Sequence, residues 1–190
     1  VLAQRIFITG GAGFIGSHLA DRLLEQDYQV VVYDNFNDFY SPSEKRANVS
    51  KHLKNPRYHL VEGDILDYEI LTSAMKGADV VVHQAAQPGV RFSIKNPEKT
   101  HEVNVTGTLM VLKAAEKNEV KRVVFASSSS VYGVPKYLPL DEEHPTNPTS
   151  PYAASKLAAE KYCQVFQTVY GLNIVVLRYF SVYGPRMRPD

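Results

Sequence analysis

A tyrosine and a lysine stand four positions apart near the end of the segment SSSSVYGVPKYLPLDEEHPTNPTSPYAASK, which covers residues 127–156. If Tyr152 and Lys156 occupy one helix, their side chains lie one turn apart on the same side. A free tyrosine has a pKa near 10, so it acts as a base at neutral pH only when a nearby cation stabilises the phenolate. Lys156 could supply that charge, and the pair could then take a proton from a substrate hydroxyl. The alternative is an ordinary solvated pair on a helix surface, which the same spacing also allows.

Three glycines stand three apart in the segment TGGAGFIG, residues 9–16, namely Gly10, Gly13 and Gly16. The segment follows a β-branched run and precedes a helical pattern. At such a junction, glycines permit a tight turn and let the backbone approach a pyrophosphate, while N–H groups at the start of the helix point at its charge. The position between a strand and a helix therefore predicts a dinucleotide-binding turn.

Acidic residues end or follow the next two β-branched runs. Asp34 lies at the distance from the glycines where a carboxylate can accept both hydroxyls of an adenosine ribose. It would repel a 2'-phosphate, and no arginine follows at once, so the sequence favours NAD over NADP. Asp64, followed by Ile65, could contact the adenine in the same way. The structural alternatives are an Asx turn at Asp34-Asn35 and a helix cap at Asp64.

The elements that must position these residues alternate between short β-branched runs and longer amphipathic stretches. The six expected strands are RIFIT (5–9), QVVVYD (29–34), YHLVEGD (58–64), DVVVH (79–83), RVVFAS (122–127) and NIVVLRY (173–179). Most are apolar on both faces, as in a parallel sheet covered by helices on each side. Helical periodicity covers 14–26, 67–76, 97–118 and 151–170, with Asn96-Pro97 and Ser150-Pro151 as helix starts. We therefore expect an α/β fold, a Rossmann-type doubly wound parallel sheet with helices on both faces, as one NAD-binding domain over residues 1–190.

The serine run follows the fifth expected strand. Its hydroxyls would lie at the C-terminal edge of the sheet, where open α/β folds bind ligands. Tyr152 and Lys156 begin the helix that comes after the intervening loop. The serines and the Tyr/Lys pair would then meet across one substrate beside a nicotinamide, whose positive charge in the oxidised form would further stabilise the phenolate.

The composition describes an ordinary globular chain. It has 44% hydrophobic and 22% charged residues, a net charge of +1 and no run of lysine and arginine, so neither nucleic acid nor a membrane is expected as a partner. The single cysteine, Cys163, cannot form an internal disulfide, and we expect it to pack within a helix. The six histidines show no metal-ligand spacing, which predicts no metal site. No targeting peptide is visible in VLAQRIFITGG, and we expect a cytoplasmic location.

The segments TGGAGFIG, YDN, GDI, HQAA, NVTGT, SSSSVYG and YAASK occur in this order and together resemble the extended short-chain dehydrogenase/reductase family of nucleotide-sugar enzymes. The resemblance runs through the whole chain. It implies a catalytic set of Ser128, Tyr152 and Lys156, with Asn104 supporting the active-site backbone and His83 in a structural role. It implies NAD as the cofactor, held by Gly10, Gly13, Phe14, Ile15, Gly16, Asp34, Asn35, Asp64, Ile65, Ala85, Ala86, Tyr152 and Lys156.

Within that family, the residues after the first serines limit which reaction types are expected. Similar sugar 4,6-dehydratases carry an Asp-Glu pair before VYG, and UDP-glucuronate decarboxylases carry a Glu there, whereas this chain has Ser129 and Ser130. What remains is hydride removal at C4 and its return on the opposite face, which is 4-epimerisation through a 4-keto sugar. The segments DNFNDFYSPSEKRANV, AAQPGVRFSIKNP and RYFSVYGPRMRPD look most like UDP-glucuronate 4-epimerases, which convert UDP-glucuronate to UDP-galacturonate.

Other functions stay open at this point. A UDP-glucose or UDP-N-acetylglucosamine 4-epimerase would use the same catalytic set. So would an NAD(P)-dependent reductase of another carbonyl substrate, which would show net turnover of the reduced cofactor. A non-catalytic NAD-binding regulatory protein is the further alternative.

A buried substrate carboxylate would need hydrogen-bond donors. The candidate donors to a carboxylate at C6 are Ser129, Ser130, Ser181 and Arg188, although Ser181 could instead cap a turn and Arg188 could be a solvated loop residue. The further expected substrate contacts are Arg91, Ser128 and Tyr152. Family members continue beyond RMRPD into a smaller lobe that closes over the nucleotide sugar, so we expect most of that lobe to be absent from this chain. Whether the chain is active without that lobe stays open at this point. The helices at 97–118 and 151–170 resemble those of a four-helix dimer interface, which implies a homodimer, yet their apolar residues could equally face the core.

Overall fold

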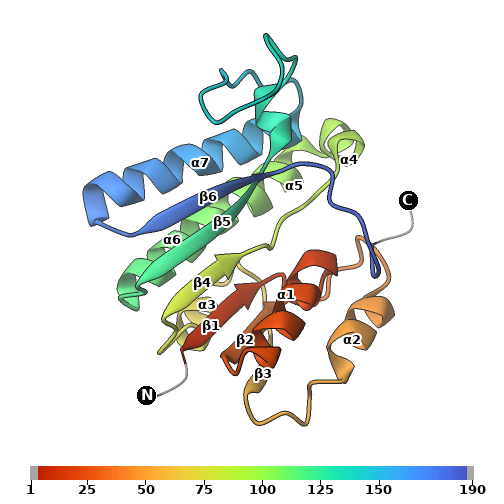
Figure 1. The fold of residues 1–190 in the computed structure, drawn as a ribbon, viewed down its shortest axis with the longest axis vertical. Coiled ribbons are helices and arrows are strands. Elements are labelled where there is room, and N and C mark those ends of the chain that lie inside the picture. Colours follow the sequence, from red (N-terminus) through yellow and green to blue (C-terminus); the bar gives the residue numbers. More distant parts are fainter. Residues whose placement is uncertain (1–3, 188–190) are drawn as a thin grey trace.

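The computed structural model describes residues 4–187. Six parallel strands form one sheet in the order β3-β2-β1-β4-β5-β6 (Figure 1). They are β1 (Arg5–Thr9), β2 (Gln29–Asp34), β3 (Tyr58–Glu62), β4 (Val80–His83), β5 (Arg122–Ser128) and β6 (Ile174–Tyr179). The chain builds outward from β1 in one direction and then from β4 in the other, which is the strand order of the Rossmann fold. The predicted doubly wound α/β architecture is confirmed.

Helices connect the strands and cover both faces of the sheet. They are α1 (Phe14–Glu25), α2 (Pro42–Ser50), α3 (Tyr68–Ala74), α4 (Val90–Lys95), α5 (Pro97–His101), the π-helix η1 (Glu102–Thr106), α6 (Gly107–Lys117), the 3-10 helix η2 (Ser129–Tyr132) and α7 (Pro151–Tyr170). Figure 1 shows α1 and α2 on one face and α3, α6 and α7 on the other. These two layers follow from strands that are apolar on both faces, because each face needs a helical cover.

The core divides into two clusters, one on each face of the sheet. Successive side chains of a strand point to opposite faces, so Phe7 lies in one cluster and Ile8 in the other. Cys163 of α7 belongs to the first cluster and is fully buried, which confirms its packing role. Burial raises the pKa of its thiol to about 12, so it stays protonated at neutral pH.

Several element boundaries differ from the sequence-based expectations. Strand β3 ends at Glu62, two residues before the expected end, and β4 begins at Val80. The expected single helix at 97–118 consists of α5, η1 and α6. The helices α2 and α4 were not expected. Helix α2 is mostly polar and buries only Lys45 and Val49, so it has almost no apolar periodicity to recognise.

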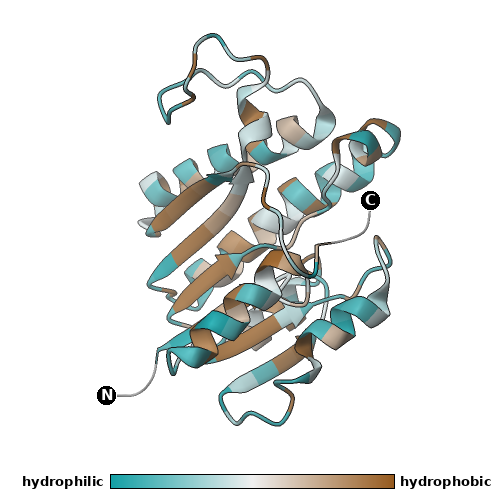
Figure 2. Ribbon diagram, turned by 45° about the vertical axis from the view of Figure 1, so that its right-hand side comes forward, coloured by the Kyte–Doolittle hydropathy of each residue, from teal (hydrophilic) through white to brown (hydrophobic). Residues whose placement is uncertain are grey.

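One part of the sheet has little cover. Helices α1 and α2 lie over the half of the sheet that contains β1, β2 and β3, while the same face of β6 carries exposed apolar side chains. Val175 is 39% exposed and Leu177 38%. The apolar colouring of β5 and β6 is visible in Figure 2.

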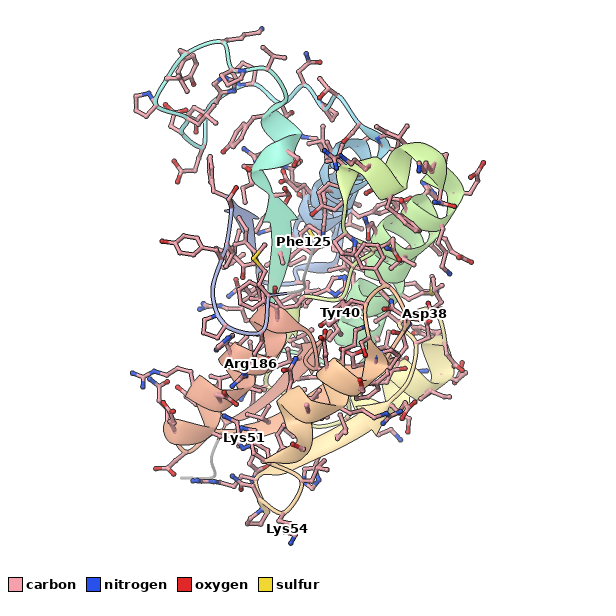
Figure 3. All side chains as sticks on the ribbon, turned by 90° about the vertical axis from the view of Figure 1, so that its right-hand side faces the viewer. Asp38, Tyr40, Lys51, Lys54, Phe125 and Arg186 are labelled. Carbon is pink, nitrogen blue, oxygen red and sulfur yellow. The ribbon has the colours of Figure 1, made fainter. Side chains whose placement is uncertain are left out.

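The segment that follows β6 returns across the sheet to α1. Arg186 donates hydrogen bonds to Ser17 Oγ (3.0 Å) and Asp21 Oδ2 (2.6 Å), and His18 Nε2 lies 2.9 Å from the carbonyl oxygen of Pro185. Lys51 also binds Asp21, and Figure 3 shows Arg186 and Lys51 on this side of the molecule. The segment after β6 is thereby held against α1.

Candidate functional site

A cavity of about 320 Å³ opens at the C-terminal edge of the sheet, where the strand order reverses between β1 and β4. Open α/β folds bind ligands at this switch point. Its lining includes eleven of the residues that the sequence predicts as cofactor contacts, namely Gly10, Gly13, Phe14, Ile15, Gly16, Asp34, Asn35, Asp64, Ile65, Ala85 and Ala86. The other two predicted cofactor contacts, Tyr152 and Lys156, do not line it. The structure therefore brings the predicted adenosine and pyrophosphate residues together.

The glycine turn between β1 and α1 leaves no room for side chains at two positions. Gly10 has a φ of +67°, and a Cβ atom there would lie 2.7 Å from the amide nitrogen of Ala85. A Cβ atom on Gly16 would overlap the carbonyl oxygen of Gly10. Gly13 is the N-cap of α1, and no side chain caps the helix. The first N–H groups of α1 are therefore available to an anion in the cavity.

Asp34 ends β2 and is buried beside the cavity. Its Oδ2 accepts a hydrogen bond from the Ala12 amide (3.0 Å), and its Oδ1 accepts one from the Phe36 amide (2.9 Å). The Asx-type turn is thus present, but it uses only part of the carboxylate, because each oxygen can accept a second bond. Burial raises the pKa of Asp34, while these hydrogen bonds and the charge of Lys45 act in the opposite direction. The group can both hold its turn and accept a ligand hydroxyl.

Asp64 also lies at the cavity and does not cap α3. Its Oδ1 accepts from the Leu66 amide and its Oδ2 from Asn35 Nδ2, each at 2.9 Å. The cap of α3 is Asp67, whose side chain accepts from the amide of Ile70. The structural alternative of a helix cap at Asp64 is therefore wrong, and a local turn takes its place.

His83 lies in the middle of a hydrogen-bond chain in which the donor and the acceptor of each bond can be assigned. The Thr108 hydroxyl donates to the carbonyl oxygen of Asn104 (2.6 Å), so it accepts from His83 Nε2 (3.0 Å). His83 Nδ1 then accepts from the Thr9 hydroxyl (2.7 Å), which in turn accepts from the Ala85 amide (3.2 Å). Burial, aided by the charge of Lys156, lowers the pKa of His83 to about 3, so the ring is neutral. This chain fixes the cofactor-lining turn after β4, which supports a structural role for His83.

Asn104 holds the same turn from the π-helix η1. Its Oδ1 accepts from the Gln87 amide (2.7 Å), and its Nδ2 donates to the Gln87 carbonyl (3.1 Å) and to Ser155 Oγ (3.0 Å). Ser155 belongs to α7, next to Lys156. Asn104 therefore connects the turn after β4 to the helix that carries the Tyr/Lys pair.

Tyr152 and Lys156 lie one turn apart in the first part of α7, as expected. The helix begins at Pro151, and the Ser150 side chain caps it by accepting from the Ala153 amide (3.1 Å). Lys156 is only 4% exposed, and its Nζ donates to the carbonyl oxygen of Ala126 (2.9 Å). Burial lowers the pKa of Lys156 to about 8. The pair is thus not the ordinary solvated pair that the spacing also allowed.

The four serines divide between two roles. The Ser127 hydroxyl donates to buried Glu160, which forms an ion pair with Arg178, so this serine belongs to the interior. Ser128 ends β5 at the C-terminal edge of the sheet, and its Oγ accepts from the Ser130 amide (3.2 Å). Ser129 and Ser130 follow in η2 and are half-buried.

The remaining predicted substrate residues do not lie in the cavity. Arg91 is exposed on α4, and Ser181 is exposed in the segment after β6. Arg188 lies outside the described residues. None of the predicted substrate residues from 91 to 181 lines the 320 Å³ cavity, and their roles stay predictions.

Sequence reasoning missed about half of the cavity lining. The additional residues are Tyr33, Asn37, Phe39, Tyr40, Lys45, Gly63, Gln84, Pro88, Val103 and Met187. Most of the first five come from the connection between β2 and α2, which has no regular pattern. Its position directly after Asp34 is the one signal that could have identified it.

No group of three or more His, Cys, Asp or Glu residues within residues 4–187 could hold a metal ion. No helix in the same range is both long and apolar enough to cross a membrane.

Comparisons with known proteins agree with this geometry. The model of a family described as "NAD dependent epimerase/dehydratase family" matches residues 6–190. A putative UDP-glucose 4-epimerase of Methanocaldococcus jannaschii is 42% identical over 97% of this chain and 58% of its own length. UDP-glucuronate 4-epimerase 6 of Arabidopsis thaliana is also 42% identical, over 97% of this chain and 41% of its own. The chain thus spans about half the length of these relatives.

Among solved structures, the chain is similar to the UDP-glucuronic acid 4-epimerase of Bacillus cereus in complex with UDP-glucuronic acid and NAD. The TM-score is 0.93 at 39% identity, and the match covers 98% of this chain and 60% of the other.

Proposed function

Because the chain belongs to the NAD-dependent epimerase/dehydratase family, we propose that it binds NAD and that the protein catalyses 4-epimerisation of a UDP-sugar. The observation that carries this proposal is the buried ammonium of Lys156, one helical turn from Tyr152, at the ligand-binding edge of the sheet. Tyr152 and Lys156 do not line the 320 Å³ cavity, but Lys156 contacts the Ala126 carbonyl of β5 near the same edge of the sheet. A cation next to a tyrosine at this edge is what deprotonation of a substrate hydroxyl needs.

The residues present fit NAD. The turn at Gly10 and Gly16 excludes any Cβ atom, and the uncapped start of α1 offers N–H groups to the pyrophosphate. Asp34 keeps acceptor capacity for the adenosine ribose. When bound, NAD would accept a hydride from C4 of the sugar and later return it.

In the proposed mechanism, the Tyr152 phenolate takes the proton of the C4 hydroxyl as the hydride leaves, which produces a 4-keto sugar. Lys156 is protonated below its pKa of about 8 and stabilises the phenolate. Ser128 donates a hydrogen bond to the same sugar oxygen. Return of the hydride to the opposite face, with the proton from Tyr152, gives the C4 epimer and leaves the cofactor pool unchanged.

We favour UDP-glucuronate as the substrate, giving UDP-galacturonate. The names of the Arabidopsis and Bacillus proteins support this choice, while the name of the Methanocaldococcus protein supports UDP-glucose. Ser129 and Ser130, without a carboxylate, suit epimerisation at C4 rather than chemistry at C5 or C6. Ser181 and Arg188 are the proposed donors to the C6 carboxylate. UDP-N-acetylglucosamine is the remaining alternative.

The proposal includes a cytoplasmic homodimer. Exposed apolar residues on the outer side of α7, at Tyr162, Val165 and Val169, lie three and four positions apart and form one stripe. Such a stripe suits helix-to-helix packing between two copies. Light scattering on the full-length protein tests this part, and a monomer at high micromolar concentration would contradict it.

The test of function is to incubate the full-length protein with UDP-glucuronate, UDP-glucose and UDP-N-acetylglucosamine separately, and to separate the C4 epimers. We expect the galacturonate epimer to form fastest, with no net change in NADH absorbance. Net consumption of NADH with another carbonyl substrate would instead identify a reductase. Binding of NAD without any turnover would support a regulatory protein.

A further inference from the structure

Glu160 is a buried carboxylate on α7 that the proposed mechanism does not use. It is 3% exposed and lies one helical turn after Lys156. Its Oε1 accepts hydrogen bonds from the Ser127 hydroxyl and from Arg178 Nε (3.0 Å), and its Oε2 accepts one from Arg178 Nη2 (2.8 Å). Arg178 thus binds both oxygens of the carboxylate, which gives the ion pair a defined geometry.

The two partners of this carboxylate lie beside the predicted catalytic serine. Ser127 and Arg178 are opposite each other in the parallel pair of β5 and β6, and Ser127 directly precedes Ser128. One position earlier in β5, the Ala126 carbonyl accepts a hydrogen bond from Lys156 Nζ (2.9 Å). Figure 1 shows α7 lying along β5 and β6. Helix α7 is therefore joined to two successive residues at the end of β5, through Lys156 and, one turn later, through the buried carboxylate.

Arg178 extends the same cluster to η2, which contains Ser129 and Ser130. Its guanidinium lies 4.8 Å from the centre of the Tyr132 ring, and Tyr132 is buried. A cation over an aromatic ring is attracted to it. One carboxylate on α7 thus connects β5, β6 and η2, the elements that carry or precede the predicted substrate serines.

The charge of Glu160 also acts on Lys156. Burial lowers the pKa of Lys156 to about 8, while the charges of Cys163 and Glu160 act in the opposite direction. Burial raises the pKa of Cys163 to about 12, so its thiol keeps its proton at neutral pH. Glu160 therefore supplies the negative charge that stabilises the Lys156 ammonium.

The other charged groups around α7 do not compete with Glu160 for this role. From the neighbouring strands, His83 of β4 is neutral, and Arg178 of β6 is paired with Glu160. The residues of β5 and η1 that hydrogen-bond to this part of α7 carry no charge. Every charged side chain from Arg91 to Lys117, in the helices α4, α5, η1 and α6 that pack against α7, is exposed.

We propose that Glu160 is a positioning residue for the Tyr152/Lys156 pair. The hydrogen bonds that it accepts from Ser127 and Arg178 fix α7 relative to the end of β5, and its charge keeps the Lys156 ammonium protonated. The proposal deepens the proposed function and rests on it, because it concerns how the base is held beside the substrate hydroxyl. A carboxylate that served only to stabilise the fold would not affect the protonation of Lys156.

The test compares two variants that break the same ion pair but change opposite charges. Glu160→Gln removes the negative charge and keeps an acceptor for the Ser127 hydroxyl, whereas Arg178→Gln removes the positive charge. Glu116→Gln is the matched control, because Glu116 is exposed on α6. In the full-length protein, one measurement is the pH dependence of kcat for the UDP-sugar that turns over fastest. The other is the titration midpoint of the Lys156 ammonium, measured by heteronuclear NMR of isotope-labelled lysine side chains, with its signal identified as the one that Lys156→Met lacks.

We expect Glu160→Gln to lower the Lys156 midpoint from about 8 by about one pH unit and to move the alkaline limb of the kcat profile with it. Arg178→Gln should leave the midpoint at the wild-type value or higher, since it keeps the negative charge. Both variants should lower kcat at pH 7 by about tenfold, because small misplacements of a catalytic group are costly. The Kd for NAD should stay within about threefold of the wild type, and Glu116→Gln should match the wild type throughout.

An unchanged midpoint in Glu160→Gln, or the same downward shift in both variants, would show that the ion pair serves stability alone. Removal of one partner of a buried ion pair can prevent folding. In that case the double variant Glu160→Gln/Arg178→Gln, which leaves neither charge unpaired, should still have a lower midpoint, and a wild-type midpoint there would reject the proposal. If the wild type turns over no UDP-sugar, the proposed function fails, and the NMR midpoints still decide whether Glu160 controls the charge of Lys156.

Discussion

At the scale of single residues, Lys156 links burial to reactivity. Its ammonium is buried, and the resulting pKa of about 8 means that it is mostly protonated at neutral pH but loses its charge within a modest rise in pH. A phenolate at Tyr152 would lose its stabilising partner in the same range. The base and its cation are therefore expected to work together only in a limited interval around neutrality.

Replacement of Tyr152 by phenylalanine should abolish epimerisation and leave NAD binding intact. The change removes the proton acceptor but keeps the ring, so turnover should fall by at least 1000-fold, within the 10²–10⁴ range that roughly describes general base catalysis. Epimer separation and an NAD titration of the same sample measure the two effects. Ser128→Ala is the comparison, with a smaller loss, because it removes one hydrogen bond. More than a tenth of wild-type turnover in Tyr152→Phe would reject Tyr152 as the base.

The lowered pKa of His83 predicts how the free energy of unfolding depends on pH. Its pKa is about 3 in the folded protein and about 6.5 in an unfolded chain, so only the unfolded state takes up a proton between these values. Stability from the neutral ring is fully present above pH 6.5 and is lost as the pH falls toward 3. The free energy of unfolding should fall by up to about 1.4 kcal/mol per pH unit in this window from His83 alone.

Denaturant unfolding of wild type and His83→Gln at intervals from pH 4.5 to 7.5 measures that slope. The variant should be less stable at pH 7, because two buried hydrogen bonds change, but its pH dependence should be shallower. Equal slopes for the two proteins would show that His83 does not titrate differently in the folded state.

About half of the cavity lining could be predicted from the sequence, and the failure to predict residues such as Lys45 has a physical cause. The glycines, Asp34, Asp64 and the Tyr/Lys pair have fixed spacings relative to strands and helices, so their positions follow from the alternation of elements. Lys45 has no such spacing. It stands in the charged run EKR of a mostly polar helix, where a lysine usually faces solvent, and only the folded connection after β2 buries it.

At the scale of elements, Asp21 joins three of them. Its carboxylate accepts from Lys51 (2.8 Å) and His52 (2.6 Å) beyond α2, and from Arg186 after β6 (2.6 Å). Burial alone would raise the pKa of Asp21, but these partners outweigh it and hold the pKa at about 2. Arg186 has a φ of +65°, which costs a residue other than glycine about 1 kcal/mol. The contacts to α1 are what maintain that conformation.

Removal of the Asp21–Arg186 contact should therefore displace the segment that carries Ser181. In the full-length protein, Arg186→Gln should raise the KM for the UDP-sugar by about tenfold, while the Kd for NAD changes less than threefold. Arg22→Gln is the matched control, because Arg22 follows Asp21 on α1 but forms an exposed pair with Glu25. An unchanged KM in Arg186→Gln, or an equal rise in the control, would contradict a positioning role for Arg186.

The helices and strands that the sequence predicted best are those with continuous or periodic apolar residues. All six strands were predicted to within two residues at each end, because buried parallel strands are continuous apolar runs. Helix α7 was predicted with its bounds, since Ser150 and Pro151 mark its start. The interruption at η1 could not be predicted, because a π-helical turn keeps the same residue types and changes only the hydrogen-bond pattern.

At the scale of the whole molecule, the least covered surface is the face of β6 that shows Val175 and Leu177. In the described part of the chain, β6 pairs with β5 only, so its other edge has unpaired backbone groups. An apolar face next to an open edge favours association between molecules.

We expect the double change Val175→Thr/Leu177→Lys to reduce aggregation of the 190-residue chain while the free energy of unfolding changes by less than about 1 kcal/mol. Both side chains are partly exposed already, so their loss opens no cavity. Val176→Lys is the contrasting variant, because Val176 packs against the core on the other face and its change should destabilise the fold. Static light scattering and denaturant unfolding measure the two quantities. Unchanged aggregation in the double variant would show that another surface is responsible.

The π-helix η1 also determines how the fold would respond to a change in length. A π-helical turn bonds residue i to i+5 and so holds one residue more than an α-helical turn, so one residue removed between 102 and 106 would convert the segment into a continuous α-helix from α5 to α6. Val111 and Leu112 of α6 would stay in the core, and the change would fall on the extra turn itself, where Asn104 contacts Gln87. A one-residue deletion in this segment should therefore loosen the turn after β4 while α6 stays folded, whereas single substitutions on the exposed side of η1, at Glu102, remain permissible.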